Sequence, residues 1–271
     1  MTVETPLDRL AEAIPDGAKL AIPADYAGVS MAMVGPLLRR GARDLHLVCV
    51  PTSGIQADLL IGAGAVATVE TSAVTLGEAG GAPAFGRAVR SGAVRVLDAT
   101  CPAIHAGLIA AQKGAPFLPM RGLIGSDILA NRPDWRVIDN PFADAGDPVV
   151  LIPAIVPDVA LFHAPAADRF GNVAIGRRRE LATMAYAARR TIVTVERILD
   201  TDLMADEASA AGTLPALYVD GIGLAPGGAA PLALWGEYET DVAAVKAYAA
   251  AARSPEALAA YIDALMGRVP A

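Results

Sequence analysis

The sequence has few of the side chains from which catalytic and metal sites are usually built. Its 271 residues include only three histidines and two cysteines, and aromatic residues make up 5% of the chain. These five residues are His46, His105, His163, Cys49 and Cys101. So small and scattered a set excludes a histidine-rich metal site, a zinc cluster and a disulfide framework. We therefore expect no metal centre in this chain.

Positive charge is also scarce. The chain has 22 Lys and Arg against 29 Asp and Glu, which gives a formal net charge of −7. Nucleic-acid-binding surfaces need a basic field, so we expect no nucleic-acid partner. Charged residues make up 19% of the chain and hydrophobic residues 54%. This balance excludes an intrinsically disordered protein, because such chains are poor in apolar residues.

Long hydrophobic runs are missing as well. The longest aliphatic blocks, around 59–69 and 149–156, are too short to cross a bilayer and contain Gly or Pro. Residues 1–15 include four charged side chains and no apolar run, which is unlike a signal peptide or an anchor. We therefore expect a cytoplasmic protein with no membrane partner. The surplus of apolar residues suggests extra burial at a subunit interface.

The chain does contain a regular alternation of short aliphatic runs and helical stretches. Strands are expected at 19–23, 45–50, 66–70, 94–97, 117–118, 149–152, 159–163 and 191–195, with a strand pair at 215–224. Helices are expected at 30–40, 55–61, 83–90, 102–113, 180–190, 238–253 and 255–266. This order predicts an α/β fold with an open, mostly parallel, doubly wound sheet and helices on both faces. Residues 122–148 have no clear periodicity and are expected to form a long loop. No repeat or linker divides the chain, which predicts one domain over 1–271.

The loop after the first expected strand is a candidate anion site. Gly28 and Ser30 lie where this strand passes into a helix, and N–H groups at a helix N-terminus bind anions. Both are therefore predicted substrate-binding residues. The alternative is an ordinary strand-to-helix turn that Ser30 caps. No segment has the glycine spacing of a dinucleotide site or a P-loop.

Cys101 lies where an expected strand passes into a helix, and His105 follows one helical turn later. Ligands of open α/β sheets bind at the carboxyl ends of strands, and a thiol at a helix N-terminus is a plausible nucleophile. The two residues are therefore candidate catalytic groups. The alternative is that Cys101 is inert, as most cysteines are. Cys49, inside an apolar strand, is expected in the core.

Carboxylates give further candidates. Glu70 ends an expected strand, and Glu78 follows in a glycine-rich loop with Gly80 and Gly81. Either carboxylate is placed for acid–base work, and the loop is placed to bind substrate. The alternatives are a solvated loop acid for Glu78 and a partner of a helix N-terminus for Glu70.

Arg121 follows an expected strand between prolines, and Ser126 lies in the next loop. An arginine in this place either clamps a carboxylate or phosphate or forms a structural ion pair. We favour the first reading for Arg121 together with Ser126. The sequence from His163 to Asn172 favours a tight turn between strands at least as strongly as any chemistry. A serine triad is excluded because no Gly-x-Ser-x-Gly elbow is present.

Taken together, an ordered set of segments over roughly residues 15–250 resembles the alpha subunit of family I CoA-transferases, with glutaconate CoA-transferase as the type. These segments are Ala82–Phe85, Arg87–Val89, Gly92, Ala106–Leu108, Pro116–Arg121, Gly125–Asp127, His163, Ala167–Asn172, Val193–Ile198, Ala225–Ala229, Tyr238 and Asp241. The resemblance implies the CoA-transferase (NagB/RpiA-like) fold. It also implies CoA or acyl-CoA as substrate, with no covalently bound cofactor.

The resemblance further implies a beta-like partner, in a heterodimer or an α2β2 assembly, and transfer of CoA from an acyl-CoA to a carboxylic acid. In the family a glutamate attacks the thioester and becomes a glutamyl-CoA thioester, which the acceptor acid then opens. In the glutaconate type this glutamate belongs to the beta subunit. The Ser-Glu-Asn-Gly signature that carries it in related enzymes is absent here. The chain alone is therefore expected to be inactive.

Two departures from the family pattern matter. The Gly-Gly-Phe-like loop after the first strand is replaced by residues 25–28, Asp-Tyr-Ala-Gly. A related branch of two-subunit ring-cleaving hydrolases uses a glutamate at the position that matches Cys101. The alternatives are therefore a CoA-thioester hydrolase or C–C lyase subunit that uses Cys101 and His105, and a non-catalytic homo-oligomer that binds acyl-CoA.

Overall fold

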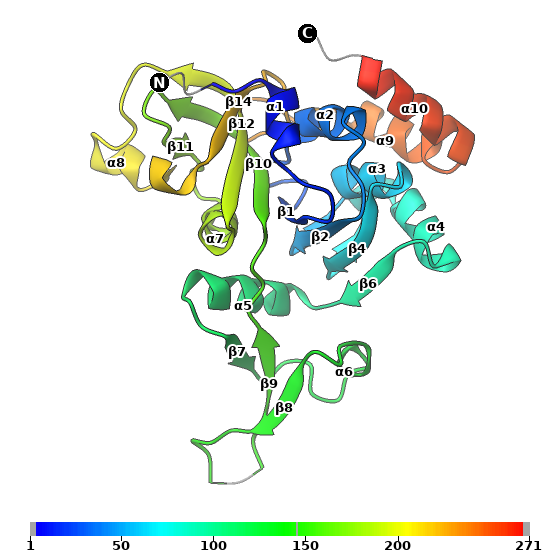
Figure 1. Ribbon diagram of the computed structural model, residues 1–271, viewed down its shortest axis with the longest axis vertical. Coiled ribbons are helices and arrows are strands. Elements are labelled where there is room, and N and C mark those ends of the chain that lie inside the picture. The colour runs from blue at the N-terminus through cyan, green and yellow to red at the C-terminus, as the bar shows by residue number, and fades with distance from the viewer. Residues whose placement is uncertain (1–3, 145, 268–271) are drawn as a thin grey trace.

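A nine-stranded sheet forms the centre of the molecule in the computed structural model, which describes residues 4–144 and 146–267 (Figure 1). Seven strands are parallel, in the order β6-β4-β2-β1-β10-β12-β14. Their bounds are β1 Lys19–Pro23, β2 Leu45–Val50, β4 Val66–Thr71, β6 Arg95–Asp98, β10 Val159–Asp168, β12 Arg190–Leu199 and β14 Gly221–Leu224. The short strands β11 (Val173–Ala174) and β13 (Thr213–Leu214) extend it antiparallel. The predicted mostly parallel, doubly wound sheet is confirmed.

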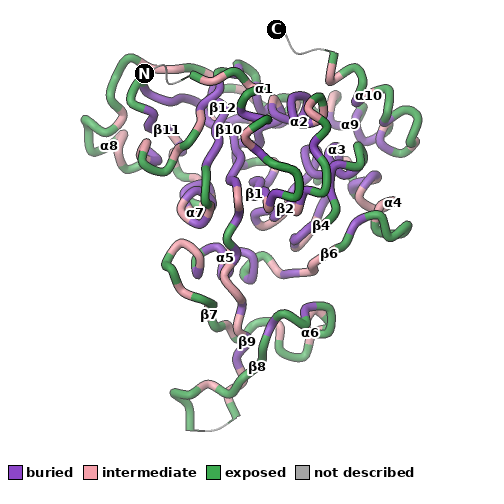
Figure 2. Tube along the Cα trace, in the orientation of Figure 1, coloured by how far each residue is buried: buried purple, intermediate pink, exposed green. Residues whose placement is uncertain are grey.

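Helices cover both faces of this sheet. One face carries α1 (Leu7–Glu12), α2 (Val34–Arg39), α3 (Ile55–Gly62), α4 (Pro83–Ser91), α9 (Val242–Ala251) and α10 (Pro255–Gly267). The other face carries α5 (Cys101–Gln112) and α7 (Arg179–Ala187). Successive strand residues point to opposite faces, so Leu47 and Cys49 enter the first core while Val48 and Val50 enter the second. This explains the continuous apolar runs, and burial is concentrated in these strands (Figure 2).

The strand order reverses between β1 and β10. From β1 the chain builds β2, β4 and β6 on one side, and it later builds β10, β12 and β14 on the other. Open α/β sheets bind ligands outside the carboxyl ends of the strands at such a reversal. Two short parallel strands, β3 (Thr52–Ser53) and β5 (Ala73–Val74), continue the chain beyond β2 and β4 on this same edge.

Residues 117–153 form a lobe that projects past α5 (Figure 1). It contains β7 (Phe117–Met120), α6 (Ile128–Asn131), β8 (Arg136–Asp139) and β9 (Pro148–Pro153), with the strands antiparallel in the order β7-β9-β8. The prediction of a loop over 122–148 is therefore wrong, and 117–118 and 149–152 do not join the parallel sheet. The lobe's elements are too short to show periodicity, and β8 is exposed along its whole length.

A buried arginine connects the lobe to the main sheet. Arg132 is 3% exposed, and its Nη2 lies 2.8 Å from Oε1 of Glu70, itself 3% exposed, at the end of β4. Its guanidinium also donates to the Asp98 carbonyl and to Asp134, and it stacks 4.1 Å from the centre of the Trp135 ring. Glu70 is thus committed to a structural ion pair, not to the helix N-terminus expected.

Several boundaries differ from the prediction. The helix expected at 30–40 begins as a 3-10 turn at Met31–Met33 and becomes α2 only at Val34. The helix expected at 238–253 begins at Val242, because the Asp241 carboxylate caps it by accepting from Ala244 N–H. Only β14 forms within the strand pair expected at 215–224. Within the described ranges, no helix is long and apolar enough to cross a membrane.

Candidate functional site

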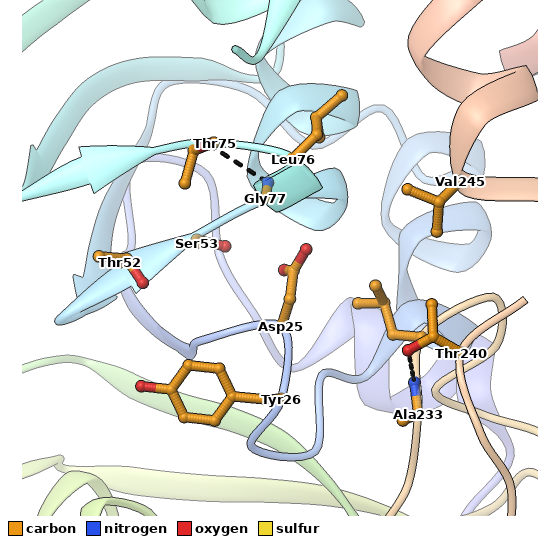
Figure 3. Close-up of a pocket in the computed structure, with 11 residues that line it drawn as sticks. Asp25, Tyr26, Thr52, Ser53, Thr75, Leu76, Gly77, Ala233, Thr240 and Val245 are labelled. Carbon is orange, nitrogen blue, oxygen red and sulfur yellow. Dashed lines mark hydrogen bonds between the residues drawn. The ribbon is translucent and has the colours of Figure 1, made fainter. Parts of the chain in front are cut away.

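A cavity of about 330 Å³ opens beside the carboxyl end of β1 (Figure 3). The loop after β1, the β3–β5 edge and the segment before α9 enclose it. It is lined by Asp25, Tyr26, Thr52, Ser53, Thr75, Leu76, Gly77, Leu232, Ala233, Thr240 and Val245. Most of the wall is apolar or hydroxylated, and Asp25 is the one carboxylate among these described lining residues. Its position and size are those of a small-molecule site in an α/β protein.

Asp25 lies at the base of this cavity, against the start of α3. Its Oδ2 accepts a long hydrogen bond, 3.4 Å, from Ile55 N–H. Its Oδ1 is shielded from solvent and has no hydrogen-bond partner among the described residues. Burial raises the pKa of Asp25 to about 6, against the opposing effect of the Ile55 and Gly54 N–H groups.

A chain of buried hydrogen bonds lies next to the cavity, at the point where the strand order reverses. His163 of β10 is fully buried, with Nδ1 2.8 Å from Thr194 Oγ1 and Nε2 2.7 Å from Glu196 Oε1. Thr194 Oγ1 lies 2.6 Å from Ser30 Oγ. Burial lowers the pKa of His163, so the ring is neutral. Because Glu196 only accepts, Nε2–H donates to it, Thr194 donates to Nδ1, and Ser30 donates to Thr194.

Glu196 is the end of this chain of bonds and collects four donors. Besides His163, it accepts from the N–H groups of Gly227 and Gly228 and from the hydroxyl of Tyr238. Burial by itself raises the pKa of Glu196, but these donors outweigh it and lower the pKa. Burial raises the pKa of Tyr238, so its hydroxyl keeps the proton that it donates.

The His163 cluster (Ser30, His163, Thr194, Glu196 and Tyr238) holds two loops together. The carbonyl of Gly28 accepts from His163 N–H, and Gly28 has a φ of +82°. A Cβ at Gly28 would overlap the His163 carbonyl, and one at Gly228 would lie 2.5 Å from the imidazole Cε1. Both loops therefore need glycine to approach the histidine so closely.

Of the predicted binding residues, Gly28 and Ser30 lie at the reversal point of the sheet. The alternative reading of Ser30 as a helix cap is wrong, since its side chain caps no helix and bonds Thr194. Gly80 and Gly81 lie together with Glu78, just after the short 3-10 turn Gly77–Ala79. Glu78 is exposed and lines a second cavity of about 260 Å³, which shares Leu76, Thr240 and Val245 with the first.

The candidate pair Cys101 and His105 lies at the beginning of α5. The Sγ of Cys101 is exposed and lies 3.1 Å from Ser72 Oγ. His105 is half-buried, and burial lowers its pKa while the charge of Glu180 on α7 opposes this. The two side chains thus contact different neighbours, and no hydrogen bond joins them in the described structure.

Arg121 and Ser126 are in the lobe. Arg121 makes a bidentate ion pair with Asp147, at 2.8 and 2.6 Å, and Ser126 donates to the Leu123 carbonyl. The fold thus gives Arg121 the structural ion pair that was the alternative reading. Within the described ranges, no three His, Cys, Asp or Glu side chains cluster as metal ligands.

Sequence reasoning missed two parts of this edge. Asp25 was noticed only as a departure from a loop pattern, although a carboxylate just after a strand is itself a signal of a site. The cluster around Glu196 joins β10, β12 and the 227–238 segment, and only the strand order brings these together.

Comparisons with known proteins agree with this geometry. Residues 3–224 match the family model described as Coenzyme A transferase. The chain belongs to the coenzyme A transferase family. It is 34% identical over 264 residues to one of the subunits of the 3-oxoadipate CoA-transferase of Pseudomonas knackmussii, covering 92% of this chain and 88% of the relative.

Two solved structures share the fold over nearly the whole chain. Glutaconate coenzyme A-transferase of Acidaminococcus fermentans matches with a TM-score of 0.89 at 26% identity, over 98% of this chain and 89% of that one. A variant of the decarboxylase AibA/AibB matches with a TM-score of 0.82 at 31% identity, over 97% and 100%. The resemblance to transferase alpha subunits is therefore confirmed, and CoA is the family's substrate.

Proposed function

We propose that this chain is the alpha-type half of a cytoplasmic CoA-transferase and that a beta-like partner completes the active site, in a heterodimer or an α2β2 assembly. The partner supplies the nucleophilic glutamate, and the chain alone has no transferase activity. This chain contributes the wall of the acyl-binding site at the carboxyl edge of its sheet.

One observation supports this division of labour above all others. The glutamates nearest the carboxyl edge are already committed: Glu70 pairs with Arg132, and Glu196 accepts four hydrogen bonds. Glu78 is exposed and faces the neighbouring cavity. The 330 Å³ cavity therefore has no glutamate of its own within the described residues to attack a thioester.

The reaction itself is a balanced exchange. The partner's carboxylate attacks the thioester carbonyl of the donor acyl-CoA, and the CoA thiolate leaves. The thiolate then attacks the glutamyl carbonyl of the mixed anhydride and releases the donor acid as its carboxylate. The acceptor acid reverses these two steps and leaves as the new acyl-CoA. No outside oxidant or reductant is needed.

The test is co-purification with the product of the neighbouring reading frame, followed by an assay of CoA transfer. We expect transfer by the pair and none by the isolated chain. Transfer at the full rate by this chain alone would overturn the proposal.

The decarboxylase relative supports a second candidate, a subunit that cleaves a C–C bond of a CoA thioester. In that case Cys101 and His105 would take part directly. Cys101→Ala would then lower kcat by orders of magnitude, whereas a wall residue would lose much less. Calorimetry with acyl-CoA that detects binding without turnover in any subunit mixture would instead identify a non-catalytic binding protein.

A further inference from the structure

Two buried oxygens at the base of the 330 Å³ cavity have no hydrogen-bond partner among the described residues. They are Oδ1 of Asp25 and Oγ of Ser53, and Ser53 is only 2% exposed. An unpaired buried polar group costs about 1–3 kcal/mol, and proteins rarely keep one without a use. Both residues line the same cavity, and in Figure 3 the Ser53 hydroxyl is on the side that faces the Asp25 carboxylate.

The remaining wall contains no counter-charge for a second anion. No Lys, Arg or His is among the described residues that line it. The wall is closed by Leu76, Leu232 and Val245 and by threonine hydroxyls, of which Thr240 already accepts from Ala233 N–H. A ligand in this cavity therefore contacts apolar surface except at the base.

Chemistry at the base favours one kind of ligand group. The Asp25 carboxylate is ionised at neutral pH, so it accepts hydrogen bonds and repels another carboxylate. The Ser53 hydroxyl both donates and accepts. An alcohol satisfies both oxygens at once, since it donates to Asp25 and accepts from Ser53 after a small turn of either side chain.

We propose that the cavity binds the acyl group of the CoA thioester, and that Asp25 and Ser53 select a short hydroxylated acyl group over a dicarboxylic one. This inference rests on the proposed function, because it assigns the specificity of the same site. It also separates this chain from its transferase relatives, which are named for the dicarboxylic acids 3-oxoadipate and glutaconate.

The experiment measures CoA transfer by the complex with its partner to three four-carbon acids. These acids are 3-hydroxybutanoate, butanoate and succinate, which differ in a hydroxyl group, no substituent and a second carboxylate. We expect kcat/KM to fall in that order, with at least about a tenfold preference for the hydroxy acid over butanoate. Equal rates, or succinate as the best acceptor, would overturn the inference while leaving the proposed function intact. Transfer to none of a broad set of acids would instead contradict the proposed function.

Variants assign the selectivity to the two residues. Asp25→Asn should raise kcat/KM for succinate about tenfold, because it removes the repelling charge. Ser53→Ala should reduce the preference for the hydroxy acid several-fold and leave succinate unchanged. Asp263→Asn removes one charge from an exposed position on α10 outside the cavity, so it serves as the charge-matched control.

Thermal melting of each variant shows whether it is folded. If Asp25→Asn does not fold, the selectivity of Ser53→Ala carries the test. Unchanged selectivity in folded variants would show that the two oxygens bind only an ordered water, and it would overturn the inference.

Discussion

Glu196 and Asp25 are two carboxylates at the same edge of the sheet, and their surroundings are opposite. Glu196 collects four hydrogen-bond donors, and these lower its pKa despite burial. Asp25 has one long bond and one unpaired oxygen among the described residues, and burial raises its pKa to about 6. The first carboxylate organises the loops, whereas the second is left for a ligand. Stability and specificity are thus assigned to different residues of one edge, and this can be tested by substitution.

The largest effect is expected from Glu196→Ala. This change removes the acceptor of His163, Tyr238 and two loop N–H groups, so several buried donors lose their partner at once. We expect a loss of about 3–4 kcal/mol in the free energy of unfolding, measured by urea titration. The native contribution exists above the unfolded pKa of the carboxyl and is lost as the pH falls through its lower folded pKa. A loss below about 1 kcal/mol would show that the His163 cluster does not hold the loops.

Gly28→Ala tests the close approach to His163. The new Cβ would overlap the His163 carbonyl at a φ of +82°, so we expect a loss of about 2–3 kcal/mol. Gly17→Ala is the matched control, because Gly17 has a φ of +73° but open space around its Cβ position. It should lose only about 1 kcal/mol. Equal losses in the two variants would mean that the backbone angle, and not the histidine, requires glycine at 28.

Asp25→Asn should act in the opposite direction and stabilise the chain. Burial raises the folded pKa of Asp25 from 3.8 to about 6, so the folded state holds this proton more tightly than the unfolded state. Its ionisation therefore costs stability as the pH rises from about 4 to 6. Above that range we expect a gain of about 2 kcal/mol in the variant, less than the pKa shift alone implies because the amide also lacks a partner.

The pH dependence separates this prediction from a simple packing change. The gain should disappear near pH 4, where the native carboxyl is protonated in both states, as urea titrations at several pH values would show. A gain that does not vary with pH would show that Asp25 is not strained by its charge.

Arg121→Ala should have the smallest effect. Its partner Asp147 also accepts from Asn140, and the guanidinium is exposed. We expect no measurable change in melting temperature, since exposed ion pairs contribute little. CoA transfer by the complex should stay within about twofold of the native rate. A large rise in KM would instead assign Arg121 the substrate contact that its sequence context suggested.

The sequence predicted the main sheet well because parallel strands buried on both faces are continuous aliphatic runs, as in Leu45–Val50. The lobe was not predictable in the same way. Its strands are short, and β8 is exposed throughout, so no period of two or 3.6 residues marks them. Their pairing depends on contacts between residues 117–120, 136–139 and 148–153, which local patterns do not encode.

The site was predicted in part. Gly28 and Ser30 follow a strand and were recognised by that position alone. The roles of Thr194 and Glu196 were hidden, because a threonine and a glutamate within a strand gain meaning only when β12 pairs with β10. Residues near charged partners were ambiguous for a different reason. A clamp and an ion pair look the same in sequence, and only the neighbour, Asp147 for Arg121, decides between them.

The buried Arg132 has a consequence for how the molecule opens. Removing the lobe from the main sheet would strand the Glu70 carboxylate, and a buried charge without its partner is costly. Amides of β9 and those at the end of β4 should therefore exchange with deuterium as one cooperative group, although they belong to different sheets. In this sense a single guanidinium makes the lobe part of the same unfolding unit as the sheet edge beneath it.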